Sequence, residues 1–466
     1  MKLISSIKSL PGKYWLLQFI QMLERLSYAA LVLQMAVYIS QKDLVGGLHF
    51  EHTEKGLIFL VWALVQNLTP VLTGGFADKF GRKRMLVIAI IIAVFGFFLA
   101  AFQREFYSFL FSVLIIGFGL GLYRPALYGM IADKVSSGNS SVAWGMNVML
   151  INVAVFFAPP LAKYLESFSW QILFIGLGVI LLFSIIPVLF IQDNNRNESN
   201  NSMIIKDTFR SLIEGKVIFI VLILSGFMII YMQFYETLPN FIYDWIDTSD
   251  IALAMNLPES MTMQTSLGKM IEFKWLYNLN SGLIIIGVVF VNWMLSGFRI
   301  TTSLIIGVII AAVGLTFSGW SQYGIAAIIG MLIYTTGEMI TNPNFSRYMS
   351  EIAPKEKKST YMGFISLSLA IGLGGGSILG GYLYQNYAEK SSLAIDYINN
   401  NFKYNSELDH SNALMTLMNL TNTSAKGATE LLWNEYSPQY IWLVFLVIGI
   451  ISALLLYLFS RKYKLS

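Results

Sequence analysis

The sequence predicts an all-helical membrane protein that crosses the bilayer 12 times, in two bundles of six helices. Three observations lead to this fold class: the composition, a series of long apolar runs, and the placement of basic residues. Of the 466 residues, 56% are hydrophobic and only 12% are charged, whereas a soluble domain of this length needs a charged surface. The net charge is +4, and the basic residues form no stripe that would suit nucleic-acid binding. Cysteine is absent, which excludes disulfides and thiol catalysis.

Apolar runs of about 20 or more residues are each long enough to cross about 30 Å of hydrocarbon as a helix. Unsatisfied backbone groups are costly in lipid, so these runs should be helices rather than open strands. The first follows a short basic N-terminus and is too long for a cleaved signal peptide. The predicted spans lie near 14–40, 54–77, 83–102, 105–132, 141–165, 169–191, 217–244, 271–295, 300–318, 322–349, 359–386 and 438–460.

Basic residues collect in alternate loops, for example Arg82 and Arg84 after the second span and Lys355 and Lys358 after the tenth. Because positively charged loops stay in the cytoplasm, both termini are predicted to be cytoplasmic. We therefore expect a multi-pass protein of the plasma membrane, with the bacterial inner membrane as the first candidate.

The two predicted bundles are joined by a polar stretch rich in asparagine. This divides the chain into an N-terminal six-helix bundle at 1–192, a cytoplasmic linker at 193–216 and a C-terminal six-helix bundle at 217–466. Two longer insertions, near 246–269 and 388–435, are predicted to be outer-facing loops with some helix.

The loop between the second and third spans reads G-G-F-A-D-K-F-G-R-K-R from Gly74 to Arg84. It resembles the loop signature of the major facilitator superfamily, G-x-x-x-D-[RK]-x-G-[RK]-[RK]. The resemblance implies that Gly74, Asp78, Gly81 and Arg82 form a cytoplasmic gate motif. Small glycines let helices approach, and Asp78 is able to cap or pair at a helix end. The alternative is a generic positively charged loop.

Five charged residues fall inside predicted spans: Glu24, Arg25, Arg124, Glu236 and Glu338. Each would cost about 3 kcal/mol in the membrane if left unpaired, so we expect them to pair or to face a water-filled pathway. The alternative is that they form structural ion pairs. If protons are coupled to transport, the three carboxylates are the candidate carriers.

Several segments together resemble the proton-dependent oligopeptide transporter family over nearly the whole chain. The segments are Gln21–Ala29 in the first span, Gly119–Ala126 in the fourth, Ile151–Ala154 followed by Pro159 in the fifth, Leu276–Asn280 in the eighth, and Gly337-Glu338 with Pro343 and Ala353-Pro354-Lys355 around the tenth. The resemblance implies proton-driven symport of di- and tripeptides by alternating access.

The resemblance also implies roles for individual residues. Arg124 would hold the peptide carboxylate, and Glu338 would receive the amino group. The substrate-binding residues would be Gln21, Tyr28, Arg124, Asn152, Glu236, Asn280 and Glu338. The proton-coupling residues would be Glu24, Arg25, Glu236 and Glu338. In the empty carrier, a salt bridge between Arg124 and Glu338 is expected.

The chain departs from the family pattern at four positions. Gln21 replaces a glutamate, Ala29 a tyrosine and Val32 an arginine, and Arg124 stands where the family has lysine. Altered coupling or an altered substrate therefore stays open.

Two alternatives remain beside peptide symport. One is a proton-coupled antiporter that exports drugs or metabolites, although the fifth span lacks the glycine-rich element typical of such antiporters. The other is a non-transporting membrane sensor or an enzyme, for which no nucleophile–base pair or metal-ligand cluster is visible in the spans. We expect no enzyme activity, no metal and no cofactor, with protons as the coupling ion, a small-molecule substrate and a monomer.

Overall fold

The computed structural model describes residues 3–40, 46–50, 52–191, 204–265, 267–402, 408–410 and 412–463. It contains two compact units, each with its own core. The first comprises Met1–Leu222, Ile284–Ile300 and Asn342–Ala370, and the second comprises Ile223–Leu283, Thr301–Thr341 and Ile371–Ser466. The start of the predicted linker, residues 193–203, lies outside the described residues.

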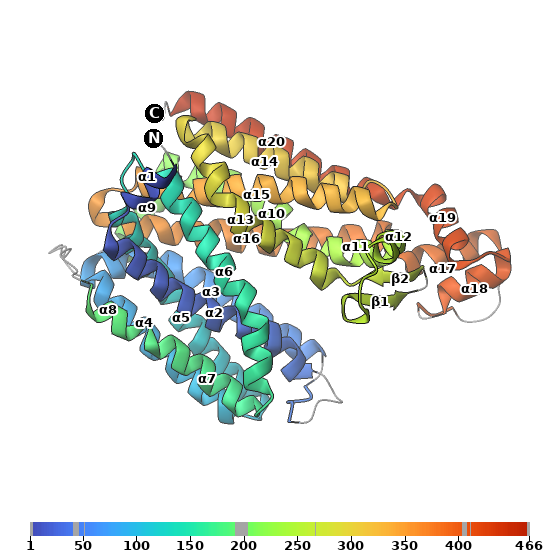
Figure 1. Ribbon diagram of the computed structural model, residues 1–466, viewed down its shortest axis with the longest axis horizontal. Coiled ribbons are helices and arrows are strands. Elements are labelled where there is room, and N and C mark those ends of the chain that lie inside the picture. Colours follow the sequence, from blue (N-terminus) through green and yellow to red (C-terminus); the bar gives the residue numbers. More distant parts are fainter. Residues whose placement is uncertain are drawn as a thin grey trace. The chain divides into compact units, whose positions relative to one another are not determined.

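The first unit contains the helices of the first predicted bundle (Figure 1). Helix α5 packs along α3 and α4, while α2 packs against α6 and α7. The helices are α1 Leu3–Lys8, α2 Gly12–Ser40, α3 His52–Phe80, α4 Arg82–Phe102, α5 Phe106–Lys134, α6 Ser140–Glu166, α7 Trp170–Phe183, α8 Ile185–Leu189 and α9 Ile204–Leu212.

The remaining helices supply the second unit, and several of them also have one end in the first. They are α10 Gly215–Tyr235, α11 Thr237–Trp245, α12 Ser249–Ala254, α13 Phe273–Met294, α14 Ile300–Ser318, α15 Gly324–Ile352, α16 Lys358–Tyr387, α17 Lys390–Asn401, α18 Ala413–Thr421, α19 Ala425–Tyr436 and α20 Ile441–Lys462. Within the described residues, short 3₁₀ turns accompany them at Glu259–Met261, Leu295–Gly297, Lys355–Lys357 and Pro438–Tyr440.

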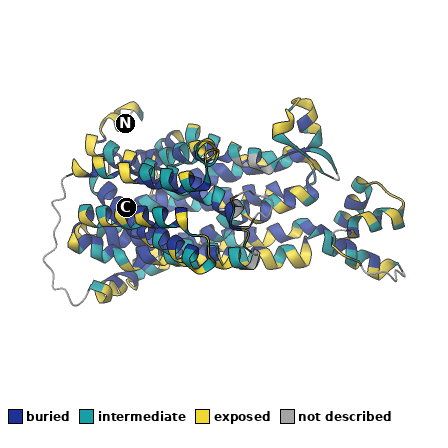
Figure 2. Cartoon of the chain, turned by 90° about the horizontal axis from the view of Figure 1, so that it is seen from below, coloured by how far each residue is buried: buried dark blue, intermediate teal, exposed yellow. Residues whose placement is uncertain are grey.

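Within the described residues, 11 helices are long and apolar enough to cross a membrane, close to the 12 predicted. Helix α20 shows why the solvent of this fold is lipid. Leu454 and Leu458 are exposed on it, while Phe445 and Leu456 are buried. Exposed and buried positions alternate along the long helices in the same way (Figure 2). A soluble helix would carry charges on its exposed face, so this pattern fits a bilayer.

Two predicted spans are broken rather than continuous. The span expected at 169–191 is divided at Ser184 into α7 and α8, and the span expected at 217–244 is divided at Glu236 into α10 and α11. Hydropathy alone misses such breaks because apolar residues continue on both sides of them.

The membrane-spanning elements are all helices, as predicted, but one of the two insertions also contains a hairpin that was not predicted. The loop expected near 246–269 holds helix α12 and a small antiparallel hairpin, β1 Thr262–Thr265 and β2 Gly268–Ile271. Gly268 has φ +120°, a conformation that suits glycine at the turn. Strands of four residues are too short to stand out by alternation in the sequence. The other insertion, near 388–435, folds into α17, α18 and α19, which pack on one another.

Candidate functional site

A buried ion pair lies on α2 in the first unit. Arg25 donates through Nε and Nη2 to the two carboxylate oxygens of Glu24, each at 2.5 Å. The Glu24 side chain is only 1% exposed. A charge buried this deeply requires a partner, and the two-pronged contact supplies it.

Arg124, on α5, lies near this pair. Its guanidinium sits 5.6 Å from the centre of the Tyr28 ring, and the Arg25 guanidinium sits 4.7 Å from the same ring. Within the described part of the chain, Arg124 makes no ion pair. The cluster therefore contains two guanidinium groups, Arg25 and Arg124, and one carboxylate, Glu24. Its net charge is one positive charge. Such a site attracts an anionic group.

Neutral polar side chains complete the cluster. Gln21 donates to the Tyr128 hydroxyl at 2.9 Å and accepts from the Asn147 amide at 2.5 Å. The Tyr28 hydroxyl donates to Gln66 at 3.4 Å. The sequence analysis missed Tyr128, Asn147 and Gln66. Tyr128 could have been found, because it lies one helical turn after Arg124 and so shares its face of α5.

The second unit holds Glu338, buried on α15 with 4% of its surface exposed. Asn280 on α13 donates to Glu338 at 2.9 Å and to the Thr335 hydroxyl at 3.0 Å, and Tyr235 also hydrogen-bonds to Glu338. The structure therefore brings together two of the predicted substrate residues, Asn280 and Glu338.

Other predicted site residues lie apart from these contacts. Asn152 donates to the Val148 carbonyl of its own helix at 2.9 Å. Glu236 stands at the break between α10 and α11 and lines a cavity. Arg124 belongs to the first unit and Glu338 to the second, so the salt bridge expected between them stays a prediction.

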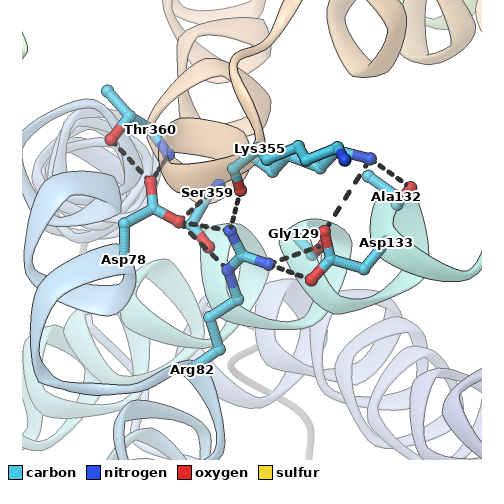
Figure 3. Close-up of polar contacts among 9 residues, drawn as sticks. Asp78, Arg82, Gly129, Ala132, Asp133, Lys355, Ser359 and Thr360 are labelled. Atoms are coloured by element: carbon cyan, nitrogen blue, oxygen red, sulfur yellow. Dashed lines mark hydrogen bonds and ion pairs between the residues drawn. The ribbon is translucent and has the colours of Figure 1, made fainter. Parts of the chain in front are cut away.

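The predicted gate motif lies in the first unit, where it meets the start of α16 (Figure 3). Asp78 accepts from Arg82 Nη2 at 2.7 Å and from the backbone N–H of Ser359 at 2.9 Å. Thr360 donates to Asp78 through both its N–H and its hydroxyl at 2.8 Å. Asp78 therefore caps the first turn of α16.

Arg82 extends this network to α5. Its guanidinium pairs with Asp133 as well as with Asp78, and Lys358 lies 3.7 Å from the same Asp133 carboxylate. Lys358 also donates to the Ala132 carbonyl at 2.6 Å. Elements from both halves of the sequence are thus tied together by alternating charges.

The two glycines of the motif, Gly74 and Gly81, are each required for a different structural reason. A Cβ at Gly74 would lie 2.7 Å from the Ser359 carbonyl oxygen, so only glycine lets α3 approach α16 this closely. Gly81 has φ +95° and is the single residue between α3 and α4, a backbone conformation that other residues rarely adopt.

A second set of contacts joins α6 to α13 and α15, also within the first unit. Ser141 donates to the Asn292 carbonyl at 2.5 Å, and Asn344 donates to the Asn292 side chain at 3.1 Å. Glu351 accepts from the Ser140 hydroxyl at 2.8 Å and from Arg347 at 3.0 Å. These residues match no signature in the sequence, because the set combines one ion pair, Arg347–Glu351, with hydroxyl, amide and backbone groups from distant segments.

Long apolar helices, buried charges and a charged network that joins the two halves of the sequence are typical of a polytopic membrane carrier. The sequence profile of the Major Facilitator Superfamily matches residues 15–377, and the chain belongs to that superfamily. It is therefore a secondary transporter of small molecules and a multi-pass protein of the plasma membrane. The proteins that it resembles are transporters, and the absence of enzyme activity in this chain stays a prediction.

Among curated proteins, the chain is similar to an uncharacterized MFS-type transporter of Bacillus subtilis (strain 168), YttB, with 24% identity over 324 residues, 68% of this chain and 76% of that protein. A Na(+), Li(+), K(+)/H(+) antiporter of Planococcus maritimus is 23% identical over 343 residues, 68% of this chain and 78% of the antiporter. The quinolone resistance protein NorA of Staphylococcus aureus (strain MSSA476) is 24% identical over 205 residues, 44% of this chain and 51% of NorA.

Two solved structures illustrate the fold. The human organic anion transporter MFSD10 (TETRAN) has a TM-score of 0.64 at 13% identity, covering 96% of this chain and 100% of that one. The proton:xylose symporter XylE has a TM-score of 0.62 at 14% identity, covering 98% of this chain and 96% of the symporter. At these identities the likeness establishes the major facilitator fold alone.

Proposed function

We propose that the chain is a proton-coupled symporter for small zwitterions, with di- and tripeptides as the first candidates. The observation that carries the proposal is the charge on Arg124. The carboxylate beside it, Glu24, is already bound by Arg25, which leaves the Arg124 guanidinium available to a substrate carboxylate. A guanidinium in a part-buried site binds a carboxylate strongly and with defined geometry.

The other end of the substrate is assigned to the second unit. A buried carboxylate such as Glu338 suits an ammonium group or a proton, and Asn280 holds it in place. The proton-coupling residues of the proposal are Glu24, Arg25, Glu236 and Glu338. The match to known families is at the level of the superfamily, so the peptide assignment depends on these residues and on the resemblance of the five segments described above.

The domain organisation belongs to the same proposal. Two six-helix bundles, at 1–192 and 217–466, would rock about the substrate, with the linker at 193–216 and both termini in the cytoplasm. The carrier would act as a monomer.

Uptake into proteoliposomes tests the proposal. A pH gradient, acidic outside, should drive labelled alanylalanine inward above its equilibrium level, and a proton-conducting ionophore should abolish the accumulation. Arg124→Gln should remove uptake, while Arg210→Gln, at an exposed position on α9, should leave it unchanged. Normal uptake by Arg124→Gln would contradict the assignment.

A proton-coupled antiporter is the second candidate, favoured by the Planococcus antiporter and NorA among the relatives. In the same vesicles an antiporter would move a cation or drug against the proton flow, and alanylalanine would not accumulate. No flux of any of these would favour a non-transporting sensor.

A further inference from the structure

A cavity of about 460 Å³ lies in the second unit, away from the contacts of Glu338. Its wall is formed by the break between α10 and α11, by the last turns of α16, and by the segment that follows α16. Its polar lining side chains are Glu236, Thr237, Asn240, Ser377, Tyr384, Gln385, Glu389 and His410. The Nδ1 atom of His410 is already engaged in a hydrogen bond with the Ser391 hydroxyl at 3.0 Å. A volume of this size admits a molecule as large as a small amino-acid derivative.

Two of the eight polar side chains that line the cavity are carboxylates, and the others are hydroxyls, amides and one imidazole. The Ser377 hydroxyl donates to the Leu373 carbonyl of its own helix at 2.9 Å, and Glu389 accepts from the Ser392 hydroxyl at 2.7 Å. The Tyr384 hydroxyl is directed to Asp244. The neighbouring cation, Lys390, is engaged elsewhere: its ammonium lies 5.2 Å from the Trp245 ring and donates to Thr429 at 3.3 Å. Two carboxylates therefore line the cavity, and Lys390 is not among the lining residues.

A pair of glycines on α16 keeps the cavity open. A Cβ at Gly380 would lie 2.1 Å from the Gln233 side-chain oxygen, so this glycine allows α16 to pack on α10. A Cβ at its neighbour Gly381, which also lines the cavity, would meet nothing within 4 Å. The space at Gly381 is thus empty of protein atoms, although the fold would accept a side chain there.

We infer that this cavity is a binding site for the ammonium group of a small organic amine. Carboxylates and neutral oxygen acceptors suit an ammonium group. Among the residues that the structure describes, no cluster of three or more His, Cys, Asp or Glu could hold a metal ion, which favours an organic cation over a metal. The volume is also larger than a single ion needs.

The site shares Glu236 with the proposed proton-coupling residues. It goes beyond the proposed function because binding there requires neither Arg124 nor Glu338. Gly381, Tyr384, Gln385 and Glu389 follow residue 377, where the match to the superfamily profile ends. Part of the site therefore lies in the segment that leads from α16 into α17. If the predicted orientation is correct, the cavity lies on the outer side, where it would gather amines before transport.

Calorimetry on the full-length purified protein tests the site, in phosphate buffer because Tris is itself an amine. The probes are alaninamide, which carries an ammonium group alone, and N-acetylalanine, which carries a carboxylate alone. Wild-type protein should bind alaninamide saturably. Gly381→Leu should fill the cavity and Glu389→Gln should remove a charge, and each should weaken alaninamide binding at least tenfold.

The matched control is Gly56→Leu, since a Cβ at Gly56 on α3 also meets nothing within 4 Å. This variant and Glu338→Gln should bind alaninamide as the wild type does. Because Glu338 is the proposed receiver of the substrate ammonium, binding retained in Glu338→Gln separates this site from the proposed peptide site. Thermal unfolding of each variant checks that it is folded. Unchanged alaninamide affinity in Gly381→Leu or in Glu389→Gln, no binding by the wild type, or equal binding of N-acetylalanine at the same site would overturn the inference.

Discussion

Asp78 accepts two hydrogen bonds from Thr360, one from its backbone N–H and one from its hydroxyl, across 282 positions of sequence. With the further bonds from Arg82 and Ser359, one carboxylate both caps a helix and neutralises a guanidinium. The contact joins the first half of the sequence to the second. If the two halves of the sequence rock as proposed, this contact breaks in one of the two states.

Asp78→Asn should therefore open the gate. The change removes the charge that Arg82 needs and weakens the cap of α16, and caps of this kind contribute about 1 kcal/mol. The measurement is maleimide labelling of a cysteine introduced as Ser359→Cys, clean because the chain has no native cysteine. Ser359 is fully buried and its hydroxyl has no partner among the described residues, so cysteine should fit.

Labelling should be about tenfold faster in the Asp78→Asn background, which corresponds to about 1.4 kcal/mol. Asp207→Asn, at an exposed position on α9, is the control and should not change the rate. Equal labelling rates with and without Asp78 would show that its contacts do not hold the gate closed.

Gly74→Ala should have the same effect by a steric route. The new Cβ would lie 2.7 Å from the Ser359 oxygen, and such overpacking typically costs about 1–3 kcal/mol. Labelling of Ser359→Cys should rise in this variant. Gly56→Ala, on the same helix in open space, should be neutral or slightly stabilising, because alanine favours helix by up to about 1 kcal/mol. A neutral result at both glycines would argue against close packing of α3 on α16.

The second set of contacts predicts a separate effect. Glu351→Gln removes the charge paired with Arg347 and weakens the bond from Ser140, so labelling should rise about two- to fivefold. The double variant with Asp78→Asn should multiply the two effects, since the two sites share no partner residue. A double variant no faster than Asp78→Asn alone would mean that Glu351 takes no part in closing the gate.

Glu24→Gln should destabilise the protein strongly. Removing one member of a buried pair leaves Arg25 uncompensated, which typically costs about 3–5 kcal/mol. The double variant Glu24→Gln with Arg25→Gln should recover much of the thermal stability. It should still exchange substrate across vesicles but should not accumulate it against a gradient, if this pair couples protons to transport. Full accumulation by the double variant would remove the pair from the coupling mechanism.

Periodicity and composition predicted most of the fold, because apolar spans and a loop signature are local properties. The loop from Gly74 to Arg84 indicated a gate, and Asp78 was expected to act at a helix end. Its actual partners, Ser359 and Thr360, could not be found, because they lie far away in sequence and their backbone groups do the binding. The break at Glu236 and the four-residue strands of the hairpin were missed for a different reason. Both are short irregularities within or beside longer patterns.

The polar cluster in the first unit also has parts that the sequence predicts and parts that only the structure shows. Glu24 and Arg25 are adjacent in sequence, and their pairing follows from the cost of charges in lipid. Asn147 looked like an ordinary polar residue in an apolar span, since its bond to Gln21 depends on how α6 packs against α2.

The most direct test of the proposed substrate site is a thermodynamic cycle. It combines a protein variant that lacks the Arg124 charge with a ligand that lacks the carboxylate charge. Calorimetry would compare alanylalanine with its C-terminal amide, in wild-type protein and in folded Arg124→Gln. If Arg124 binds the substrate carboxylate, the wild type should favour alanylalanine at least tenfold over the amide, and the variant should bind both equally weakly. A variant that still prefers alanylalanine by the wild-type factor would contradict the account.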